Sequence, residues 1–535
     1  MSRLLIYNAN LLSFHEGFSA SANGSRPSAS ATDALLVNGP HIEALGTWEE
    51  LQSLAGPDTQ RIDLQGRTLM PGFHDTHIHL WKVGNLLTFM LDVRSAASLD
   101  EMLSMLEQYQ ARYPEAAWIT ARGFNEAAWA SGRMPTNRDL DKVTQDRPVY
   151  LIRTCAHIAV CNSKALEICG ITKDTPAPPG GAIYTDEGGR PNGIFSETAL
   201  GLITPFIPPY SKTQLKTMVR AARTECYKFG ITAATDPAVD PLLLETYHEM
   251  ETDEDLGFRL QAIPILLPDG GGRPYPLPAA FTSDYLTVNT VKFFSDGGLS
   301  GGTAALKRTY RNSTEKGILR LQKDQYLSLC RAAQTRGLGI ATHAIGDAAI
   351  EMVIEIYKQL HDTFPDAIRR IEHLGLPEAR HLQDMAAYGI GTSMQAIFIH
   401  ELGKNFRRHL DEEYLSRCYP LRSALREGIL VALSSDAPVV KDFNPFKGIQ
   451  AAITRTDSEG QPIAPLETID VREALKAYTL SAATLSRTPQ WGALQPGKLA
   501  DFIVLDRDPL ATPTGELTDI RVDATYVAGK PVWTR

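Results

Sequence analysis

Two histidines separated by one residue, His77 and His79, are the side chains whose spacing most directly suggests chemistry. They stand near the end of an apolar stretch, residues 69–80, which Pro71-Gly72 interrupts. On an extended strand, side chains two positions apart leave the same face. We therefore predict a strand that points both imidazoles one way, as two ligands of one metal ion must. The alternative is two histidines that merely pack at the end of a strand.

Four further polar residues interrupt or follow β-rich stretches: Lys292, His343, His373 and Asp436. Each has an ordinary structural explanation when taken alone. A strand lysine commonly extends its charge to water, a histidine often completes a hydrogen bond in the core, and an aspartate near a proline is common in turns. Their shared position at the ends of apolar runs is harder to explain structurally and indicates a site.

The elements that must position these residues alternate regularly. From about residue 211, helical stretches alternate with β-rich runs at residues 231–236, 258–265, 290–295, 339–343, 370–373, 391–395 and 430–434. With the opening stretch this makes eight expected strands. Eight strands separated by helices predict an α/β fold, a (β/α)8 TIM barrel, in which reactive groups collect at the carboxyl ends of the strands.

Two parts of the chain lie outside this pattern. About 150 residues separate the opening strand from residue 231, far more than one crossover helix requires. Residues 211–229 can supply that helix, which leaves an insertion at about 90–205. Short strands at both chain ends predict a small β-sandwich domain, because neither set could be stable alone. The predicted domains are 1–65 with 490–535 for the sandwich and 66–489 for the barrel.

Composition excludes several partners. The 535 residues include 62 acidic and 53 basic side chains, a net charge of -9, without a basic run that could follow a nucleic acid backbone. No apolar window approaches the length of a membrane span. The first apolar run ends at Asn8, too early for a secretion signal. We expect a small-molecule substrate, no nucleic acid and no membrane.

Cysteine usage bears on location. The six cysteines contain no C-x-x-C pair, and buried thiols suit a reducing compartment, so we expect a cytoplasmic protein. A homodimer is expected only because twofold assemblies are common.

The pattern of site residues resembles a known family. A His-x-His in strand one, lysine in strand four, histidines in strands five and six and aspartate in strand eight resemble the amidohydrolase superfamily. Further stretches resemble its amidohydrolase-3 branch, which includes N-substituted formamide deformylases; they are residues 121–126, 133–136, 157–163, 291–297, 343–347 and 495–501. The resemblance covers nearly the whole chain, and it implies the barrel and a metal centre.

Counting ligands favours two metal ions. Four imidazoles and one aspartate suit zinc, but they are too many for one tetrahedral site that keeps a position open for water. An ammonium repels a cation, and lysine has a reference pKa of about 10.4. Burial and nearby metal charge favour the neutral amine, which can take up carbon dioxide and become a carbamate. The resemblance implies this carboxylated, bridging role for Lys292.

The expected roles follow from this count. One ion would be held by His77, His79 and Asp436, and the other by His343 and His373, with Lys292 between them. A bridging water with a pKa of about 7 would supply hydroxide to attack a carbonyl carbon. Asp436 would accept its proton and return it to the leaving amine. Resemblance in residues 157–163 implies that His157 helps to polarise the carbonyl.

The amidohydrolase-3 resemblance favours cleavage of a C–N bond in a non-peptide amide, such as a formamide. Trp81, Phe124, Trp129 and Phe398 would suit an aromatic or alkyl N-substituent, or they could be core residues.

Three alternatives stay open. A cyclic amide, carbamate or lactone hydrolase would use the same centre. A mononuclear deaminase would not need Lys292. A metal-bound scaffold without activity would lack a ligand or base, and none is missing.

Overall fold

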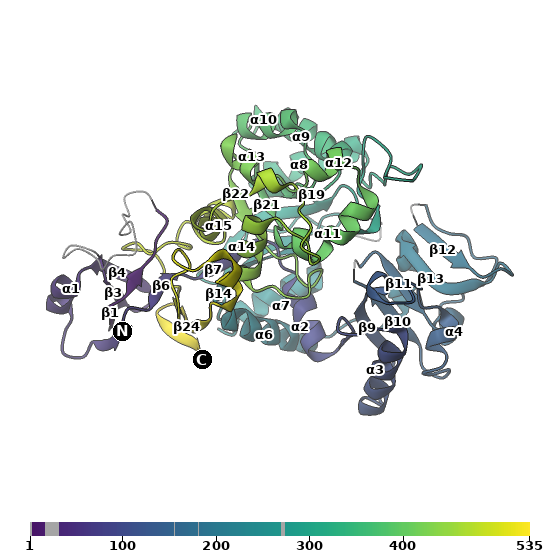
Figure 1. Ribbon diagram of the computed structural model, residues 1–535, viewed down its shortest axis with the longest axis horizontal. Coiled ribbons are helices and arrows are strands. Elements are labelled where there is room, and N and C mark those ends of the chain that lie inside the picture. Colours follow the sequence, from purple (N-terminus) through teal and green to yellow (C-terminus); the bar gives the residue numbers. More distant parts are fainter. Residues whose placement is uncertain (1–2, 16–31, 155, 180, 269–272) are drawn as a thin grey trace. The chain divides into compact units, whose positions relative to one another are not determined.

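The computed structural model describes residues 3–15, 32–154, 156–179, 181–268 and 273–535. The chain divides into two compact units. The main unit comprises Met1–Leu80, Ala222–Leu266 and Leu277–Arg535, and the second unit comprises Trp81–Ala221 and Leu267–Pro276. Figure 1 shows the elements of both units.

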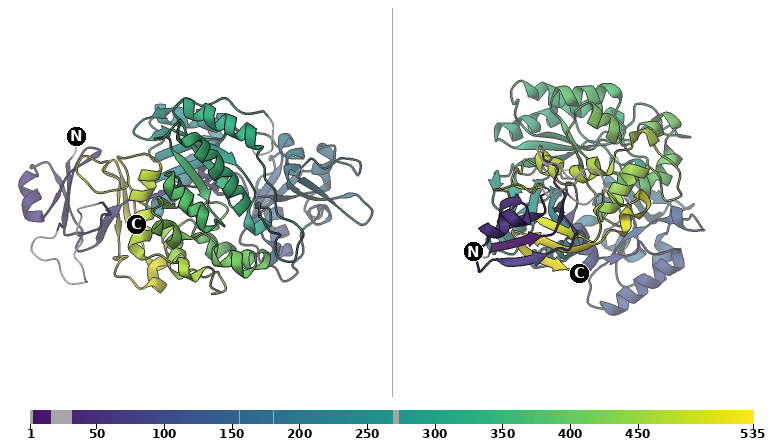
Figure 2. Two further views of the ribbon diagram at one scale, coloured as in Figure 1. Left: turned by 90° about the horizontal axis from the view of Figure 1, so that it is seen from above. Right: turned by 60° about the vertical axis from the view of Figure 1, so that its left-hand side comes forward.

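Strands from both ends of the chain form two sheets in the main unit. The first sheet has the order β4-β3-β1-β5 and consists of β1 (Arg3–Tyr7), β3 (Ala34–Asn38), β4 (His41–Gly46) and β5 (Gln60–Asp63). The second sheet has the order β2-β6-β23-β24-β25 and consists of β2 (Asn10–Leu11), β6 (Thr68–Pro71), β23 (Phe502–Leu505), β24 (Val522–Val527) and β25 (Lys530–Thr534). Figure 2 shows purple N-terminal strands beside yellow C-terminal ones.

One hydrophobic cluster joins these two sheets. Leu4 and Ile6 of β1 contribute to the same cluster as Phe502 and Val504 of β23. Both pairs stand two positions apart, so each strand turns one face toward the shared core. Because strands this short bury too little surface alone, the two ends of the sequence fold together. The sandwich arrangement of the two sheets stays a prediction.

The other main-unit strands form two five-stranded sheets, and a strand is present within each of the eight stretches expected to supply the barrel. One has the order β16-β17-β15-β14-β7 and consists of β7 (Phe73–Asp75), β14 (Ile231–Val239), β15 (Arg259–Pro264), β16 (Phe281–Thr282) and β17 (Leu286–Val288). The other runs in sequence order through β18 (Thr290–Phe294), β19 (Gly339–Ala344), β20 (Arg369–His373), β21 (Gly391–Met394) and β22 (Val431–Leu433). Apart from the antiparallel β16–β17 pair, neighbouring strands run parallel.

Helices follow most of these strands, and their apolar faces explain why they form. In α9 (Asp347–His361), Ile350, Val353, Ile354 and Tyr357 are buried at the three- and four-residue spacing of one helical face. The other main-unit helices are α1 (Trp48–Leu54), α7 (Pro241–Thr252), α8 (Lys323–Thr335), α10 (Ala379–Ala387), α11 (Ile397–His409), α12 (Glu412–Ser416), α13 (Leu421–Arg426), α14 (Pro445–Thr454), α15 (Val471–Ala477) and α16 (Leu480–Leu485). The expected crossover helix is confirmed as α6 (Lys212–Lys228).

The second unit has its own sheet and core. Its sheet order is β12-β13-β11-β10-β9-β8, from β8 (Leu91–Asp92), β9 (Ile119–Phe124), β10 (Val149–Arg153), β11 (Ile158–Cys161), β12 (Gly181–Thr185) and β13 (Pro191–Glu197). Its helices are α3 (Leu99–Arg112), α4 (Asn137–Leu140) and α5 (Ser163–Ile168). The boundary between the units falls after Leu80, so α2 (Leu80–Thr88) belongs to the second unit from its second residue onward. Phe124 and Trp129 belong to its buried core, which accounts for them as packing residues. The predicted domain boundaries stay a prediction.

The remaining helical pieces are short 3-10 turns: η1 (Glu126–Ala128), η2 (Thr198–Leu202), η3 (Thr204–Phe206), η4 (Leu299–Gly301), η5 (Pro465–Glu467) and η6 (Thr514–Asp519). Across the described ranges, no helix combines the length and apolar character that crossing a bilayer requires. Five of the six cysteines are described, all as free thiols, and Cys155 lies outside the described residues.

The turn after β19 makes a close backbone contact that a side chain would break. A Cβ added to Gly346 would lie 1.9 Å from the carbonyl oxygen of Ala305, in the segment that follows β18. We expect Gly346→Ala to lower the free energy of unfolding by about 1–3 kcal/mol, because the two backbones must separate. Gly515→Ala, where nothing lies within 4 Å, is the matched control and should be near neutral. Equal denaturant midpoints for the two variants would contradict this packing.

Burial of His74 in β7 predicts acid sensitivity. Burial, and then the charge of Arg370, lowers the pKa of His74 from 6.5 to about 3. Below pH 6.5 His74 binds a proton in the unfolded chain, but in the folded chain it does not do so until about pH 3. The free energy of unfolding therefore falls as the pH falls through this window.

His74→Gln can keep the contact to Thr235 without this proton uptake. Between pH 7 and pH 5, it should lose about 2 kcal/mol less unfolding free energy than the parent protein. Urea titrations at both pH values measure this difference, and parallel losses would argue against a buried neutral imidazole.

Candidate metal centre

Six residues predicted from the sequence as ligands lie in the main unit, in or just after its parallel strands. Lys292 lies in β18, His343 in β19 and His373 at the end of β20. His77 and His79 follow β7, and Asp436 follows β22. All six side chains are buried. Their burial removes them from bulk water, so their polar atoms require partners within the protein or a bound ion.

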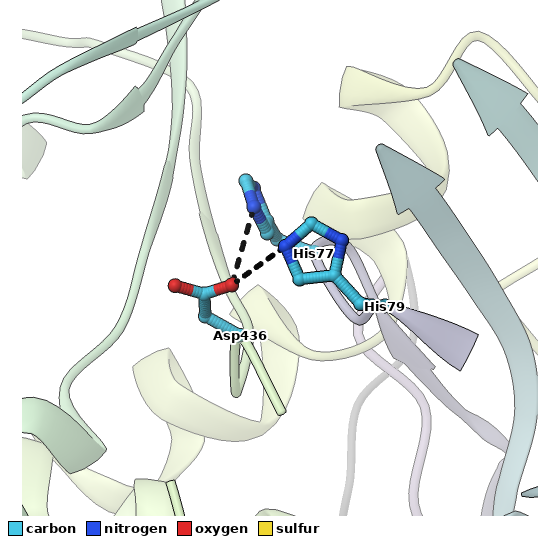
Figure 3. Close-up of side chains that lie close together, drawn as sticks. All are labelled: His77, His79 and Asp436. Carbon is cyan, nitrogen blue, oxygen red and sulfur yellow. Dashed lines mark ion pairs between the residues drawn. The ribbon is translucent and has the colours of Figure 1, made fainter. Parts of the chain in front are cut away.

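Three of these side chains form a tight group of potential ligands. One ligand atom from each of His77, His79 and Asp436 lies within 4.8 Å of the others. Oδ1 of Asp436 is 3.5 Å from Nε2 of His77 and 3.3 Å from Nε2 of His79. Figure 3 shows both rings turned toward this carboxylate. The sequence prediction that these three residues meet agrees with the geometry.

The other three residues adjoin this group. The ring centroid of His373 is 4.7 Å from that of His77 and 4.5 Å from that of His343. The ammonium of Lys292 lies 4.9 Å from the ring centroid of Phe294, which is 5.3 Å from that of His343. The structure therefore brings the four histidines and Asp436 together, and Lys292 lies on β18, next to the strand that carries His343.

The prediction that His77 and His79 lie on one strand is wrong. The chain forms β6 and β7, and both histidines lie in an irregular link between Asp75 and the first residue of α2. The cause is the Asp75 side chain, whose Oδ1 accepts the backbone N–H groups of His77 and Ser435, each over 3.1 Å. A side chain thus takes a backbone donor that a neighbouring strand would otherwise bind.

Backbone hydrogen bonds connect this link to the segment that carries Asp436. The amide of Asp436 donates to the carbonyl of His77 over 2.7 Å, and the amide of His79 donates to the carbonyl of Ala437 over 2.9 Å. The meeting of the two histidines with the aspartate therefore depends on these bonds and not on strand alternation.

Two histidines are oriented through their Nδ1 atoms. Nδ1 of His77 contacts the carboxylate of Glu372, and Nδ1 of His373 lies 2.7 Å from the side-chain oxygen of Gln395. A neutral imidazole carries one N–H, and both partners accept, so each Nε2 keeps its lone pair. Metal binding requires such a lone pair.

His343 is oriented through Nε2 instead of Nδ1. Its Nε2 lies 3.1 Å from the carbonyl oxygen of Gly297, which can only accept, so Nδ1 keeps the lone pair. Behind His79, a carboxylate oxygen of Asp236 lies 4.0 Å from Nδ1, and the hydroxyl of Tyr247 donates to Asp236 over 2.5 Å. His343 therefore has a hydrogen-bond partner that orients its ring, and His79 has a carboxylate nearby.

The charge states suit a divalent cation. Burial, and next the positive charge of Lys292, lowers the pKa of His77 well below its ordinary value. Burial alone raises the pKa of Asp436. The neighbouring histidines, of which His77 has the largest effect, lower that pKa below its usual range. A neutral imidazole and an ionised carboxylate at neutral pH are the forms that bind metal. This nitrogen and oxygen donor set fits zinc or a similar ion.

His157 lies in the second unit, immediately before β11. Its Nδ1 is 3.0 Å from a carboxylate oxygen of Glu197, and its side chain is half-buried. This contact supports a structural role within the second unit. The catalytic role expected for His157 stays a prediction.

Sequence reasoning missed the residues that hold the ligands, among them Glu372, Gln395 and Asp236. A signal existed for Glu372, because it stands two positions from Arg370 in a fully buried strand, so both charged side chains face one side. Phe398 was expected to line a pocket or to lie in the core, and its ring stacks on that of His373 at 6.2 Å. No sequence spacing pairs Gln395 with His373.

Known proteins resemble this chain over nearly its whole length. The model of the amidohydrolase family matches residues 60–533. The putative amidohydrolase YtcJ of Bacillus subtilis (strain 168) is 29% identical over 515 residues, covering 94% of this chain and 96% of YtcJ. An N-substituted formamide deformylase of Arthrobacter pascens is 30% identical over 522 residues, covering 94% of each chain.

A solved structure shares the fold. The crystal structure of an uncharacterized metal-dependent hydrolase from Pyrococcus horikoshii OT3 superposes with a TM-score of 0.78 at 24% identity, covering 96% of this chain and 99% of that one. The family match spans the sheets that carry the six clustered residues, and the resemblance predicted from sequence motifs is confirmed. This chain therefore belongs to the amidohydrolase family, in the amidohydrolase-3 branch.

Proposed function

We propose that this amidohydrolase cleaves a C–N bond in a small non-peptide amide, most simply an N-substituted formamide. The observation that carries the proposal is the group of His77, His79 and Asp436 within 4.8 Å, with two more histidines and a buried lysine beside it. The formamide deformylase of Arthrobacter pascens, 30% identical, supports the choice of substrate class.

We assign the six residues to two divalent ions, with zinc as the ion that the donor set favours. His77, His79 and Asp436 would hold one ion, and His343 and His373 the other. Lys292 is fully buried, and a lone ammonium between two cations would repel both. As a carbamate, formed when its neutral amine adds carbon dioxide and releases a proton, it would be an anion able to bridge them.

The ions, when bound, would lower the pKa of water to about 7 and polarise the substrate carbonyl. The chain's own residues then handle the proton. One oxygen of Asp436 faces His77 and His79, and we assign the other to hold the proton taken from water. Asp436 would return that proton to the departing amine. His157 would assist at the carbonyl.

We also propose that the two five-stranded sheets close into the (β/α)8 TIM barrel. An isolated parallel bridge joins Ile265, just after β15, to Lys292 in β18. The hydrogen bonds between His77 and Asp436 join the first expected strand to the eighth. These two contacts connect both edges of the β18–β22 sheet to the other sheet. The terminal sheets would form the β-sandwich.

The three-residue ligand group taken alone would also suit a mononuclear deaminase. Lys292 favours two ions over one. It lies near enough to His77 and His373 to contribute, after burial, to lowering the pKa of both, and it would have no role beside a single ion. Cyclic amides, carbamates and lactones would use the same centre. The cytoplasmic location and the homodimer stay predictions.

Metal content tests the two-ion assignment. The purified protein should hold about two divalent ions per chain, measured by plasma mass spectrometry. Lys292→Ala should lose at least one ion and nearly all hydrolysis, and acetate or propionate should restore part of both by replacing the carbamate.

Lys323→Ala, which removes an exposed lysine paired with Glu355, is the matched control and should keep both ions. One ion in the parent protein, or full activity of Lys292→Ala, would contradict the bridged pair.

A substrate panel tests the reaction. N-benzyl and N-alkyl formamides should release formate. Asp436→Asn should lower the rate of formate release by about two to four orders of magnitude, because the proton carrier is lost. No formate from any formamide, with turnover of lactones or cyclic ureas by the same preparation, would move the assignment to that class.

A further inference from the structure

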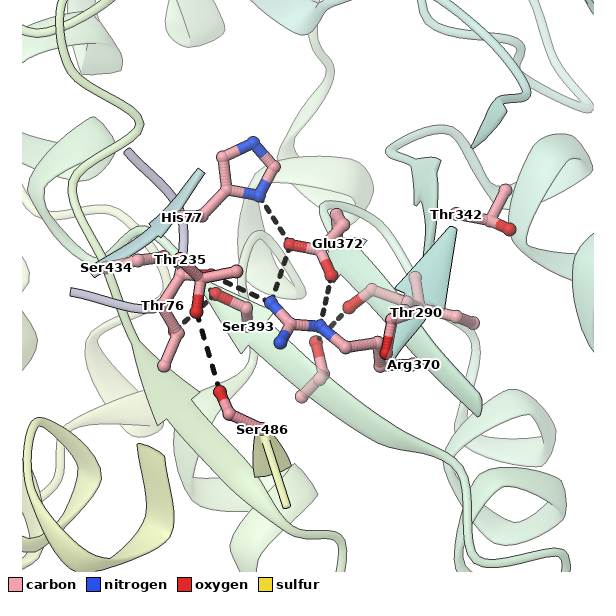
Figure 4. A network of polar contacts seen from close by, with 12 residues as sticks. Thr76, His77, Thr235, Thr290, Thr342, Arg370, Glu372, Ser393, Ser434 and Ser486 are labelled. Atoms are coloured by element: carbon pink, nitrogen blue, oxygen red, sulfur yellow. Dashed lines mark hydrogen bonds and ion pairs between the residues drawn. The ribbon is translucent and has the colours of Figure 1, made fainter. Parts of the chain in front are cut away.

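A buried carboxylate lies directly behind the candidate metal centre. Glu372 of β20 is fully buried, and one of its oxygens contacts Nδ1 of His77. Arg370, two residues earlier on the same strand, is also fully buried and donates two hydrogen bonds to this carboxylate. Figure 4 shows the guanidinium, carboxylate and imidazole in a row.

The same guanidinium also holds the backbone next to His77. Nη2 of Arg370 donates to the carbonyl oxygen of Thr76 over 2.8 Å. The hydroxyl of Thr76 contacts that of Ser393 over 2.7 Å and donates to the carbonyl of Leu433 over 3.2 Å. Both the backbone before His77 and the far side of its ring are therefore fixed from β20, which leaves the ring little freedom to rotate.

The chemistry of this row bears on how His77 binds a cation. An ionised carboxylate can only accept a hydrogen bond, so it requires the proton of His77 on Nδ1. Nε2 is then the atom with the lone pair, and it is the atom 3.5 Å from Asp436. A carboxylate behind a metal-binding histidine also makes the imidazole a stronger donor. Arg370 is permanently charged and keeps the carboxylate in its ionised form.

We propose that Glu372, held by Arg370, is a positioning residue that sets the divalent-cation affinity of His77. The proposal rests on the proposed function in one respect, that His77 is a metal ligand. It goes beyond that function because it assigns the cation affinity of His77 to a pair of buried charged side chains, Glu372 and Arg370.

A purely structural explanation competes with this proposal. A buried ion pair could simply stabilise β20, and breaking it would leave Arg370 as an unpaired buried charge. A second buried pair in the main unit allows the two explanations to be separated. Arg259 and Asp501 are both buried and form two hydrogen bonds of 2.8 and 3.0 Å. Asp501→Asn makes the same chemical change at this pair, outside the six-residue cluster.

The experiment measures zinc affinity and thermal stability of the full-length protein, using zinc ions and a chromophoric chelator as competitor. Glu372→Gln should bind zinc about 10–100 times more weakly and should also melt at a lower temperature. Asp501→Asn should melt at a lower temperature with unchanged zinc affinity. The double variant Arg370→Met/Glu372→Gln, which removes both charges, should regain melting temperature while its zinc affinity stays low.

The outcomes separate the possibilities. Unchanged zinc affinity in Glu372→Gln, or recovery of affinity in the double variant, would overturn the positioning role and leave a structural ion pair. A parent protein that binds no zinc or other divalent ion would overturn both this inference and the proposed function. If zinc affinity falls as expected but no formamide releases formate, the inference stands and only the substrate class is rejected.

Discussion

The contact of His77 and His79 with the carboxylate of Asp436 is the interaction on which the candidate site depends. It joins the first and the last of the expected barrel strands, and it is supported by paired backbone hydrogen bonds. Burying a carboxylate and several imidazoles away from water costs several kcal/mol unless they find partners. The parallel sheets supply some partners, and a pair of cations would supply the rest.

The ligands and their supports come from neighbouring strands in a regular way. Strand β20 carries the proposed ligand His373. One and three positions earlier it carries Glu372 and Arg370, which contact His77 and the backbone before it. Gln395, one residue after β21, supports His373. Glu372 and Gln395 thus each contact a histidine from another strand, so a change at either residue should affect a proposed ligand that its own strand does not carry.

Much of this could be predicted from the sequence. The strands were predictable because their apolar runs and flanking helices repeat regularly. The candidate ligands were identified because they interrupt or follow those runs. The end of β7 at Asp75 was not, because it depends on a carboxylate that binds the amide of Ser435, 360 positions away. The role of Glu372 was not predicted for a similar reason: its partner His77 lies on another strand, and no local spacing records that contact. The fold of the second unit also escaped prediction: the sequence showed only that about 90–205 is longer than a crossover requires.

Locating the ions in a metal-loaded crystal tests the central claim most directly. Anomalous diffraction at the zinc edge should show two peaks, about 3.5–4 Å apart, among His77, His79, His343, His373 and Asp436. Density for a carboxyl group should extend from Nζ of Lys292 between them. A single peak, peaks outside this cluster, or an unmodified Lys292 would contradict the two-ion account.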